Sequence, residues 1–135
     1  MRALLLDLGH AGQLGKTLQD MLESHTSLSV SYRQEFIDLR IPRTFETTFR
    51  RNREEVNPDL ILLIVVSKAI EQADGLISRI GNEASHLPIL VLFEDPTSGD
   101  VMTVIPKHGT VHFIPAPLEP VCVLQLIWRL VCGMP

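Results

Sequence analysis

The sequence predicts an α/β protein, an open sheet of five parallel strands with five helices on both faces. The first supporting observation is the run from Leu60 to Val66, seven apolar residues that follow Pro58-Asp59. Such a short run, rich in β-branched side chains, is typical of a strand buried on both faces. The second is that similar runs alternate with segments of helical spacing along the whole chain, which favours β-α units with right-handed crossovers.

The first half of the chain supplies two more strands and two helices. A strand over 3–6 ends at Asp7, and apolar residues at helical spacing predict a helix over 13–24. Residues 28–32 alternate between apolar and serine positions, which indicates a strand at a sheet edge with one face more exposed to solvent. A second helix is expected over 40–55, and its arginines are balanced by glutamates, as on a solvated helix face.

The second half repeats the alternation. An apolar stripe predicts a helix over 70–80 that stops at a glycine, and residues 88–93 repeat the signature of a buried strand. We then expect a short helix from Val101 to Gly109, a fifth strand over 111–114 and a final helix over 117–131.

Length and composition limit the possible functions. The 135 residues predict one domain, 1–135, that buries about two-thirds of its surface without a disulfide or a metal. A net charge of −4 argues against binding of nucleic acid by this domain. No signal sequence is present, and no apolar run reaches the roughly 18 residues of a membrane span. We expect a cytoplasmic domain in which Cys122 and Cys132 are reduced core residues.

Three segments in this order carry a resemblance to a known family: residues 58–63, 87–92 and 111–120. Together they resemble the receiver domain of two-component response regulators, and the resemblance covers essentially the whole chain. It implies a flavodoxin-like fold with strand order 2-1-3-4-5. In such folds ligands bind at the carboxyl ends of the strands.

The resemblance also implies that the receiver site is degenerate in this chain. It places Ile64 where the family has its phosphate-accepting aspartate, Phe93 at the Thr or Ser position and Ala116 at the lysine position. Of the acidic pair that holds magnesium, Asp7 remains and Leu8 replaces the other. An alkyl group has no nucleophilic oxygen, and one carboxylate is a poor octahedral site. We therefore expect no catalytic residue, no phosphoacceptor, no metal and no cofactor.

The final helix predicts a contact surface. Only Gln125 and Arg129 are polar between Pro120 and Cys132, and a helix that is apolar nearly all round is buried on more than one side. In the receiver family this part of the fold is a common surface for homodimers or domain contacts. The expected interface consists of Val101, Met102, Ile105, Leu124, Ile127, Trp128 and Val131.

Other interpretations of the strand ends stay open. Gly9, Gly12 and Gly15 could form a nucleotide phosphate loop, although neither the dinucleotide spacing nor a P-loop ending is present. A hydrolase pair of Ser67 with a histidine such as His112 lacks the nucleophile-elbow pattern.

The acidic rim offers two more alternatives. Asp7, His10, Glu94 and Asp95 could bind a divalent metal through mixed nitrogen and oxygen ligands. Asp7 or Asp95 could accept a phosphoryl group in place of the missing aspartate.

These observations predict a pseudo-receiver, a non-enzymatic module of signal transduction. We expect it to form the N-terminal segment of a bacterial transcription regulator and to act by homodimerisation or by contact with an output domain. The expected dimer surface combines the helix after Val101, the strand over 111–114 and the final helix. The alternative is a small-molecule or nucleotide sensor that uses the turn from Gly9 to Gly15.

Overall fold

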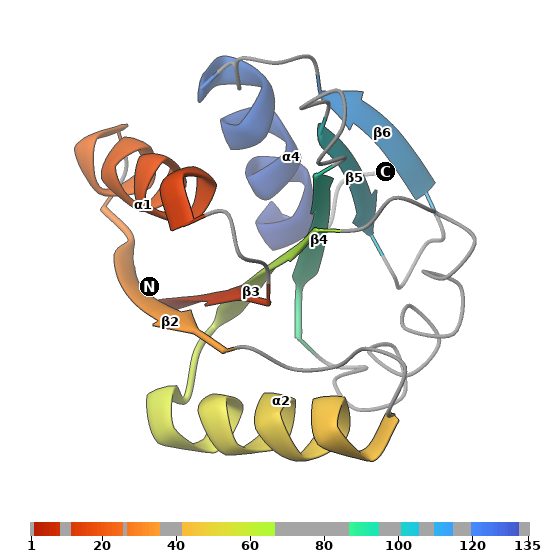
Figure 1. Ribbon diagram of the computed structural model, residues 1–135. Coiled ribbons are helices and arrows are strands. Elements are labelled where there is room, and N and C mark those ends of the chain that lie inside the picture. Colours follow the sequence, from red (N-terminus) through yellow and green to blue (C-terminus); the bar gives the residue numbers. More distant parts are fainter. Residues whose placement is uncertain are drawn as a thin grey trace.

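A computed structural model shows an α/β fold, and it describes residues 2–8, 12–25, 27–35, 42–66, 87–94, 101–105, 110–114 and 120–132. Six strands form one sheet in the order β2-β1-β3-β4-β5-β6 (Figure 1). They are β1 (Arg2–Asp7), β2 (Ser29–Gln34), β3 (Leu60–Val66), β4 (Ile89–Glu94), β5 (Val101–Ile105) and β6 (Thr110–Ile114). The helices within the described ranges are α1 (Gly12–His25), α2 (Pro42–Val56) and α4 (Pro120–Cys132).

The predicted parallel core is confirmed for the first four strands. β1 pairs in parallel with β2 and with β3, and β3 pairs in parallel with β4. β3 is the central buried strand that its apolar run predicted, since residues from Leu60 to Val65 are at most 1% exposed. β2 is an edge strand, as its alternating sequence predicted.

The helices cover both faces of this sheet. Phe45 and Phe49 of α2 pack against one face with β1 residues such as Leu4. Leu18 of α1 and Val123 of α4 pack against the other face. Figure 1 shows the same division, with α1 and α4 on one side of the sheet and α2 on the other.

The expectation of five parallel strands is wrong beyond β4. Residues 101–105 form strand β5 instead of a helix, and β5 pairs antiparallel with both β4 and β6. The strand predicted over 111–114 is confirmed as β6, but β5 separates it from β4. Since residues 101–105 form a strand, the predicted number of five helices is wrong. The expected helix over 70–80 lies outside the described residues.

The reason for this difference is local. Four of the five residues of β5 are β-branched, a composition that favours strands, and five residues are too few for a stable helix. Only six residues connect β4 to β5 and four connect β5 to β6. A parallel crossover needs about a dozen residues or more, whereas hairpins need only a few.

Helix α2 ends on a left-handed cap. Asn57 has a φ of 51°, and its N–H donates to the carbonyl oxygen of Arg53 at 2.8 Å. Asparagine tolerates this conformation better than most residues, so the position suits the sharp exit from α2 toward β3. Among the described residues, no helix combines the length and apolar character that crossing a bilayer requires.

Candidate functional site

The candidate site lies at the carboxyl ends of β1, β3 and β4, and this end of the sheet is called the sheet edge below. The register aligns Asp7 of β1 with Ile64 of β3, and Ile64 with Leu92 of β4. The N–H of Leu8 donates to the carbonyl oxygen of Ile64 at 2.8 Å, so the end of β1 is held directly against β3. This edge is where a receiver would carry its chemistry.

Four of the predicted site residues are buried at this edge. Asp7 and Ile64 are 0% exposed, Phe93 is 3% and Leu8 is 6%. Ala116 lies outside the described residues. Ile64 packs in the core between the sheet and α1 and α4, whereas Leu8 and Phe93 pack in the core on the α2 side. These apolar side chains therefore contribute to two separate cores, one on each face of the sheet.

Asp7 is held by a tyrosine of the edge strand. The Tyr32 hydroxyl donates to Asp7 Oδ2 at 2.8 Å, and the Glu35 N–H donates to the Asp7 carbonyl oxygen at 2.9 Å. A buried carboxylate is costly unless it is hydrogen-bonded, and the phenol supplies such a bond. Asp7 thus joins β1 to β2.

The carboxylate also changes the acidity of the phenol. Burial of Tyr32, followed by the hydrogen bond to Asp7 and the negative charge of Asp7, raises the pKa of Tyr32 to about 12. All three causes favour the neutral phenol over the phenolate. Tyr32 consequently stays a hydrogen-bond donor throughout the physiological pH range.

Gly15 provides the space that Tyr32 occupies. A Cβ at Gly15 would lie 2.3 Å from Cε2 of Tyr32 and 2.9 Å from both its Cζ and its hydroxyl oxygen. The ring therefore packs directly on the α1 backbone. This contact explains why a glycine is present at position 15 without the nucleotide-loop interpretation. Gly9 lies outside the described residues, and Gly12 is the first residue of α1.

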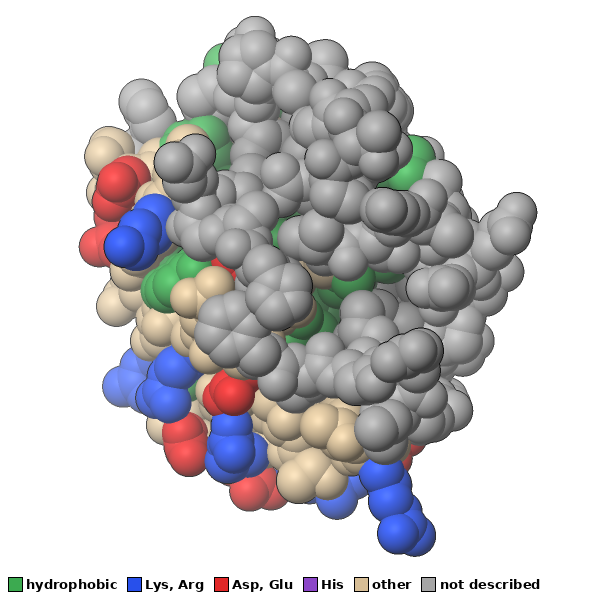
Figure 2. All heavy atoms as spheres, in the orientation of Figure 1, with side chains coloured by type: hydrophobic (Ala, Val, Ile, Leu, Met, Phe, Trp, Pro, Cys, Tyr) green, Lys and Arg blue, Asp and Glu red, His purple; other side chains and the backbone are tan. Residues whose placement is uncertain are grey.

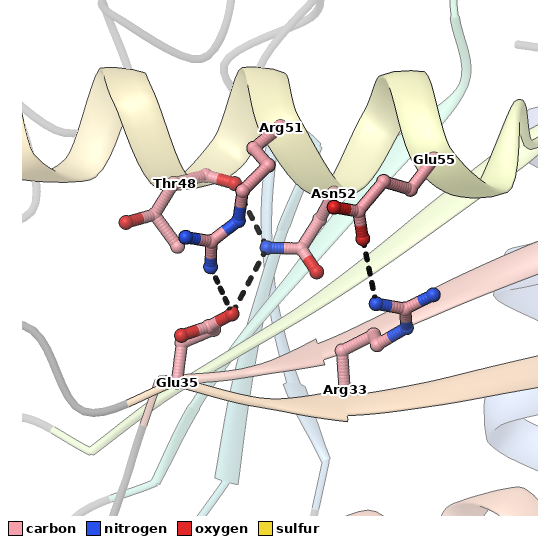
Figure 3. Close-up of polar contacts among 6 residues, drawn as sticks. All are labelled: Arg33, Glu35, Thr48, Arg51, Asn52 and Glu55. Atoms are coloured by element: carbon pink, nitrogen blue, oxygen red, sulfur yellow. Dashed lines mark hydrogen bonds and ion pairs between the residues drawn. The ribbon is translucent and has the colours of Figure 1, made fainter.

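A polar seam joins β2 to α2 (Figure 3). Arg33 Nη1 lies 2.8 Å from Glu55 Oε2, and Arg51 forms an ion pair with Glu35. Asn52, which is fully buried, donates from Nδ2 to the Thr48 carbonyl oxygen at 2.8 Å. The same nitrogen lies 3.4 Å from Glu35 Oε1.

The seam explains part of the arginine cluster of α2. Arg51 is used in the ion pair with Glu35, and Figure 2 shows blue and red side chains intermingled on the part of the surface that α2 occupies in Figure 1. Exposed ion pairs contribute about 0–1 kcal/mol each. The seam therefore fixes the orientation of α2 more than it adds stability, and the mixed charge agrees with a solvated helix face.

The predicted interface residues fall into different environments. Val101, Met102 and Ile105 belong to strand β5 and not to the expected helix, so their secondary structure is corrected, whereas their part in an interface stays a prediction. Met102 packs against the α2-side core. Of the α4 residues, Ile127 is buried, Leu124 is half-buried against the core and Trp128 is 63% exposed. The side chain of Val131 lies outside the described residues.

Cys122 corrects another expectation. It is exposed and free on α4, and is not a core residue. The side chain of Cys132 lies outside the described residues.

The predicted metal rim is not assembled within the described part of the chain. Asp7 is buried and bonded to Tyr32, and the side chains of His10, Glu94 and Asp95 lie outside the described residues. Among the described side chains, no three of His, Cys, Asp and Glu are grouped so that they could hold a metal ion.

Sequence reasoning missed Tyr32 and the packing of its ring on Gly15. Tyr32 is 25 residues from Asp7, and only the parallel register of β1 and β2 brings the two residues together. One signal was present: Tyr32 is the only tyrosine of the chain, and it lies on a predicted edge strand beside the strand that ends in Asp7.

Tyr32 predicts a loss of stability at alkaline pH. Its pKa is about 12 in the folded protein against 10.0 for the free group, so the contribution to stability is complete below pH 10 and is lost as pH rises toward 12. Two pKa units correspond to about 2.7 kcal/mol. Solvent screening of this half-buried ring reduces the expected loss to on the order of 1 kcal/mol. Because the chain has one tyrosine, the ultraviolet absorbance of tyrosinate measures this ionisation directly.

The control for this titration is Asp7→Asn, which removes the negative charge but keeps an acceptor oxygen. We expect the folded variant to titrate at a lower pH than the wild type. A wild-type transition at the pH of the urea-unfolded chain would contradict the role given to Asp7.

Comparisons with known proteins identify no relative. No protein-family model, no curated protein and no solved structure matches this chain.

Proposed function

We propose that this protein is a non-catalytic regulatory module, a pseudo-receiver that acts by contact with other proteins and without aspartyl phosphorylation. The supporting observation is the state of the sheet edge. Ile64 is fully buried at the position that the receiver resemblance assigns to the phosphoacceptor. An acceptor must present an oxygen to the phosphodonor, and an alkyl group in a packed core cannot do so.

The remaining carboxylate supports the same proposal. Asp7 is fully buried, and its Oδ2 accepts a hydrogen bond from Tyr32. Magnesium retains several waters and binds through exposed carboxylate oxygens. A buried aspartate that is hydrogen-bonded to a phenol serves as a structural link between strands, which suits a module that does not bind magnesium.

The arrangement of the first four strands also agrees with this class. The parallel series β2-β1-β3-β4 is the order that the receiver resemblance implies for its first four strands. The antiparallel strand β5 differs from the receiver class. The proposal therefore depends on the parallel strands β1, β3 and β4, whose ends carry the site. Within the proposal, the module belongs to a bacterial regulator of transcription and transmits its signal through homodimerisation or an output domain.

The test is exposure to small phosphodonors. Acetyl phosphate with magnesium is expected to leave the intact mass unchanged, and beryllium fluoride with magnesium is expected to leave the two-dimensional amide NMR spectrum unchanged. A receiver with an intact aspartate, treated in parallel, is the positive control. A mass gain of one phosphoryl group, or NMR shifts clustered at Asp7, would overturn the proposal.

A further inference from the structure

Strand β2 closes the sheet on one side. It is the terminal strand of the order β2-β1-β3-β4-β5-β6 and pairs with β1 on its inner side, and Figure 1 shows it at the margin of the sheet. The outer side of an edge strand presents backbone N–H and C=O groups with which a strand of another chain can pair. A side chain that occupies these groups limits such pairing.

The hydrogen bonds at the end of β2 show which of its backbone groups face outward. The Glu35 N–H donates to the Asp7 carbonyl oxygen at 2.9 Å, so the backbone of residue 35 faces β1. In a parallel pair the N–H and C=O of one residue point to the same side, and those of the next residue point to the opposite side. The register of β1 and β2 continues without a break from Ser29 onward. The backbone groups of Val30 and Tyr32 therefore face away from the sheet.

Gln19 of α1 reaches one of these outward groups. Its Nε2 donates to the Val30 carbonyl oxygen at 3.3 Å. Gln19 comes one helical turn after Gly15, so the two residues lie on the same side of α1, and Gly15 is the residue against which the Tyr32 ring packs. The close approach of α1 to β2 that Gly15 permits therefore brings the Gln19 amide to the outer side of β2.

The contact with Gln19 lies where β2 has no charged side chain of its own. Residues 28–32 are uncharged, and the first charge in this part of the chain is Arg33. Arg33 is exposed and pairs with Glu55 at 2.8 Å, so charged groups border the carboxyl end of the strand. Charged side chains are one way in which proteins block the addition of a strand. The uncharged part of β2 has the Gln19 amide in their place.

We propose that Gln19 protects the uncharged part of β2 from pairing with the β2 strand of another copy of the chain. An added strand needs the Val30 carbonyl oxygen as an acceptor, and it competes there with the Gln19 amide. Pairing of two copies through their β2 strands would displace two such amides, one from each chain. The proposal concerns the edge strand and is independent of the proposed function.

Gln19→Ala is the main variant. Alanine favours a helix and position 19 is half-buried, so this variant should fold. Sedimentation from about 10 μM to 1 mM, the range of weak association, compares its mass with that of the wild type. Because two hydrogen bonds no longer oppose the pairing, we expect the association constant to rise at least about fivefold. The mass of the variant should then move from 15.1 kDa toward twice that value at lower concentrations than for the wild type.

Amide hydrogen exchange shows whether the outer side of β2 is the surface used. In Gln19→Ala the N–H groups of Val30 and Tyr32 should exchange more slowly in concentrated than in dilute protein, because an added strand accepts hydrogen bonds from them. In the wild type both rates should be independent of concentration. Association of Gln19→Ala equal to that of the wild type would overturn the proposal. Stronger association without slower exchange at these two amides would overturn it as well.

Three further variants separate the amide from other causes. Gln19→Met keeps the length of the side chain but has no donor, and it should associate as Gln19→Ala does. Thr17→Ala on the exposed face of α1 is the matched control and should behave as the wild type. Ser29→Lys added to Gln19→Ala places a charge at an exposed position of β2 and should return association to the wild-type level. A Met variant that stays as the wild type, or a rise in Thr17→Ala, would overturn the role given to the amide.

Discussion

Ile64→Asp, which restores the aspartate that the receiver resemblance assigns to this position, is expected to destabilise the protein strongly at neutral pH. Ile64 is fully buried among apolar side chains such as Leu62 and Leu92. An unpaired charge in such a core costs about 3–5 kcal/mol, and the lost apolar packing adds to this. Because small domains are stable by only about 5–15 kcal/mol, urea titration followed by circular dichroism should show a loss of at least about 4 kcal/mol.

Two control variants separate the causes of this loss. Ile64→Asn has the size and polarity of the aspartate without its charge, so the difference between the two isolates the buried charge. Ile64→Val removes one methylene group and should cost only about 1 kcal/mol. Equal stability of the Asp and Asn variants at neutral pH would show that the carboxylate reaches water. The edge would then be more open than a packed core.

Gly15→Ala is expected to destabilise the protein by about 2 kcal/mol, although alanine normally favours a helix over glycine by roughly 0.5–1 kcal/mol. The new Cβ would lie 2.3 Å from the Tyr32 ring, so the ring must move. Movement of the ring weakens the hydrogen bond to Asp7 and leaves a buried carboxylate short of a donor. Urea unfolding measures the change.

The control is the same substitution in a Tyr32→Ala background. There the ring is gone, and Gly15→Ala should become neutral or stabilising by up to about 1 kcal/mol. The reversal of sign is the diagnostic result, because contacts that couple give non-additive changes. An equal effect in both backgrounds would show that Gly15 is needed for some reason other than Tyr32.

The parallel half of the fold could be predicted because its signals are local and strong. The seven apolar residues of β3, a short run preceded by Pro58-Asp59, are typical of a buried strand, and the polar alternation of β2 indicates an edge. The positions of Ile64 and Phe93 in buried strands followed from the same pattern. Their burial is therefore the best-predicted part of the candidate site.

The antiparallel half could not be predicted from hydrophobic spacing. Val101, Met102, Val104 and Ile105 have offsets of one, three and four residues, which fit one face of a helix as well as a strand buried on both sides. The short connections and the β-branched residues favoured the strand. The helical offsets alone predict a helix here, and the composition and the short connections decide for the strand.

The link from Asp7 through Tyr32 to Gly15 could not be predicted for a different reason. It depends on the register of β1 and β2 and on the position of α1 above them, which are tertiary features. A sequence pattern indicates that a tyrosine lies on an edge strand, but not which neighbour its hydroxyl reaches.

The β4-β5-β6 meander gives the sheet two regions of different contact order. Paired residues in the meander are close in sequence, such as Ile105 with Thr110, whereas the β1–β3 pairing joins Ala3 to Leu60. Closing the longer loop costs more chain entropy before any contact is gained. The entropic barrier to folding is therefore concentrated in the parallel half, where Asp7 and Ile64 lie, and the late-assembling part of the sheet is also the part that carries the candidate site.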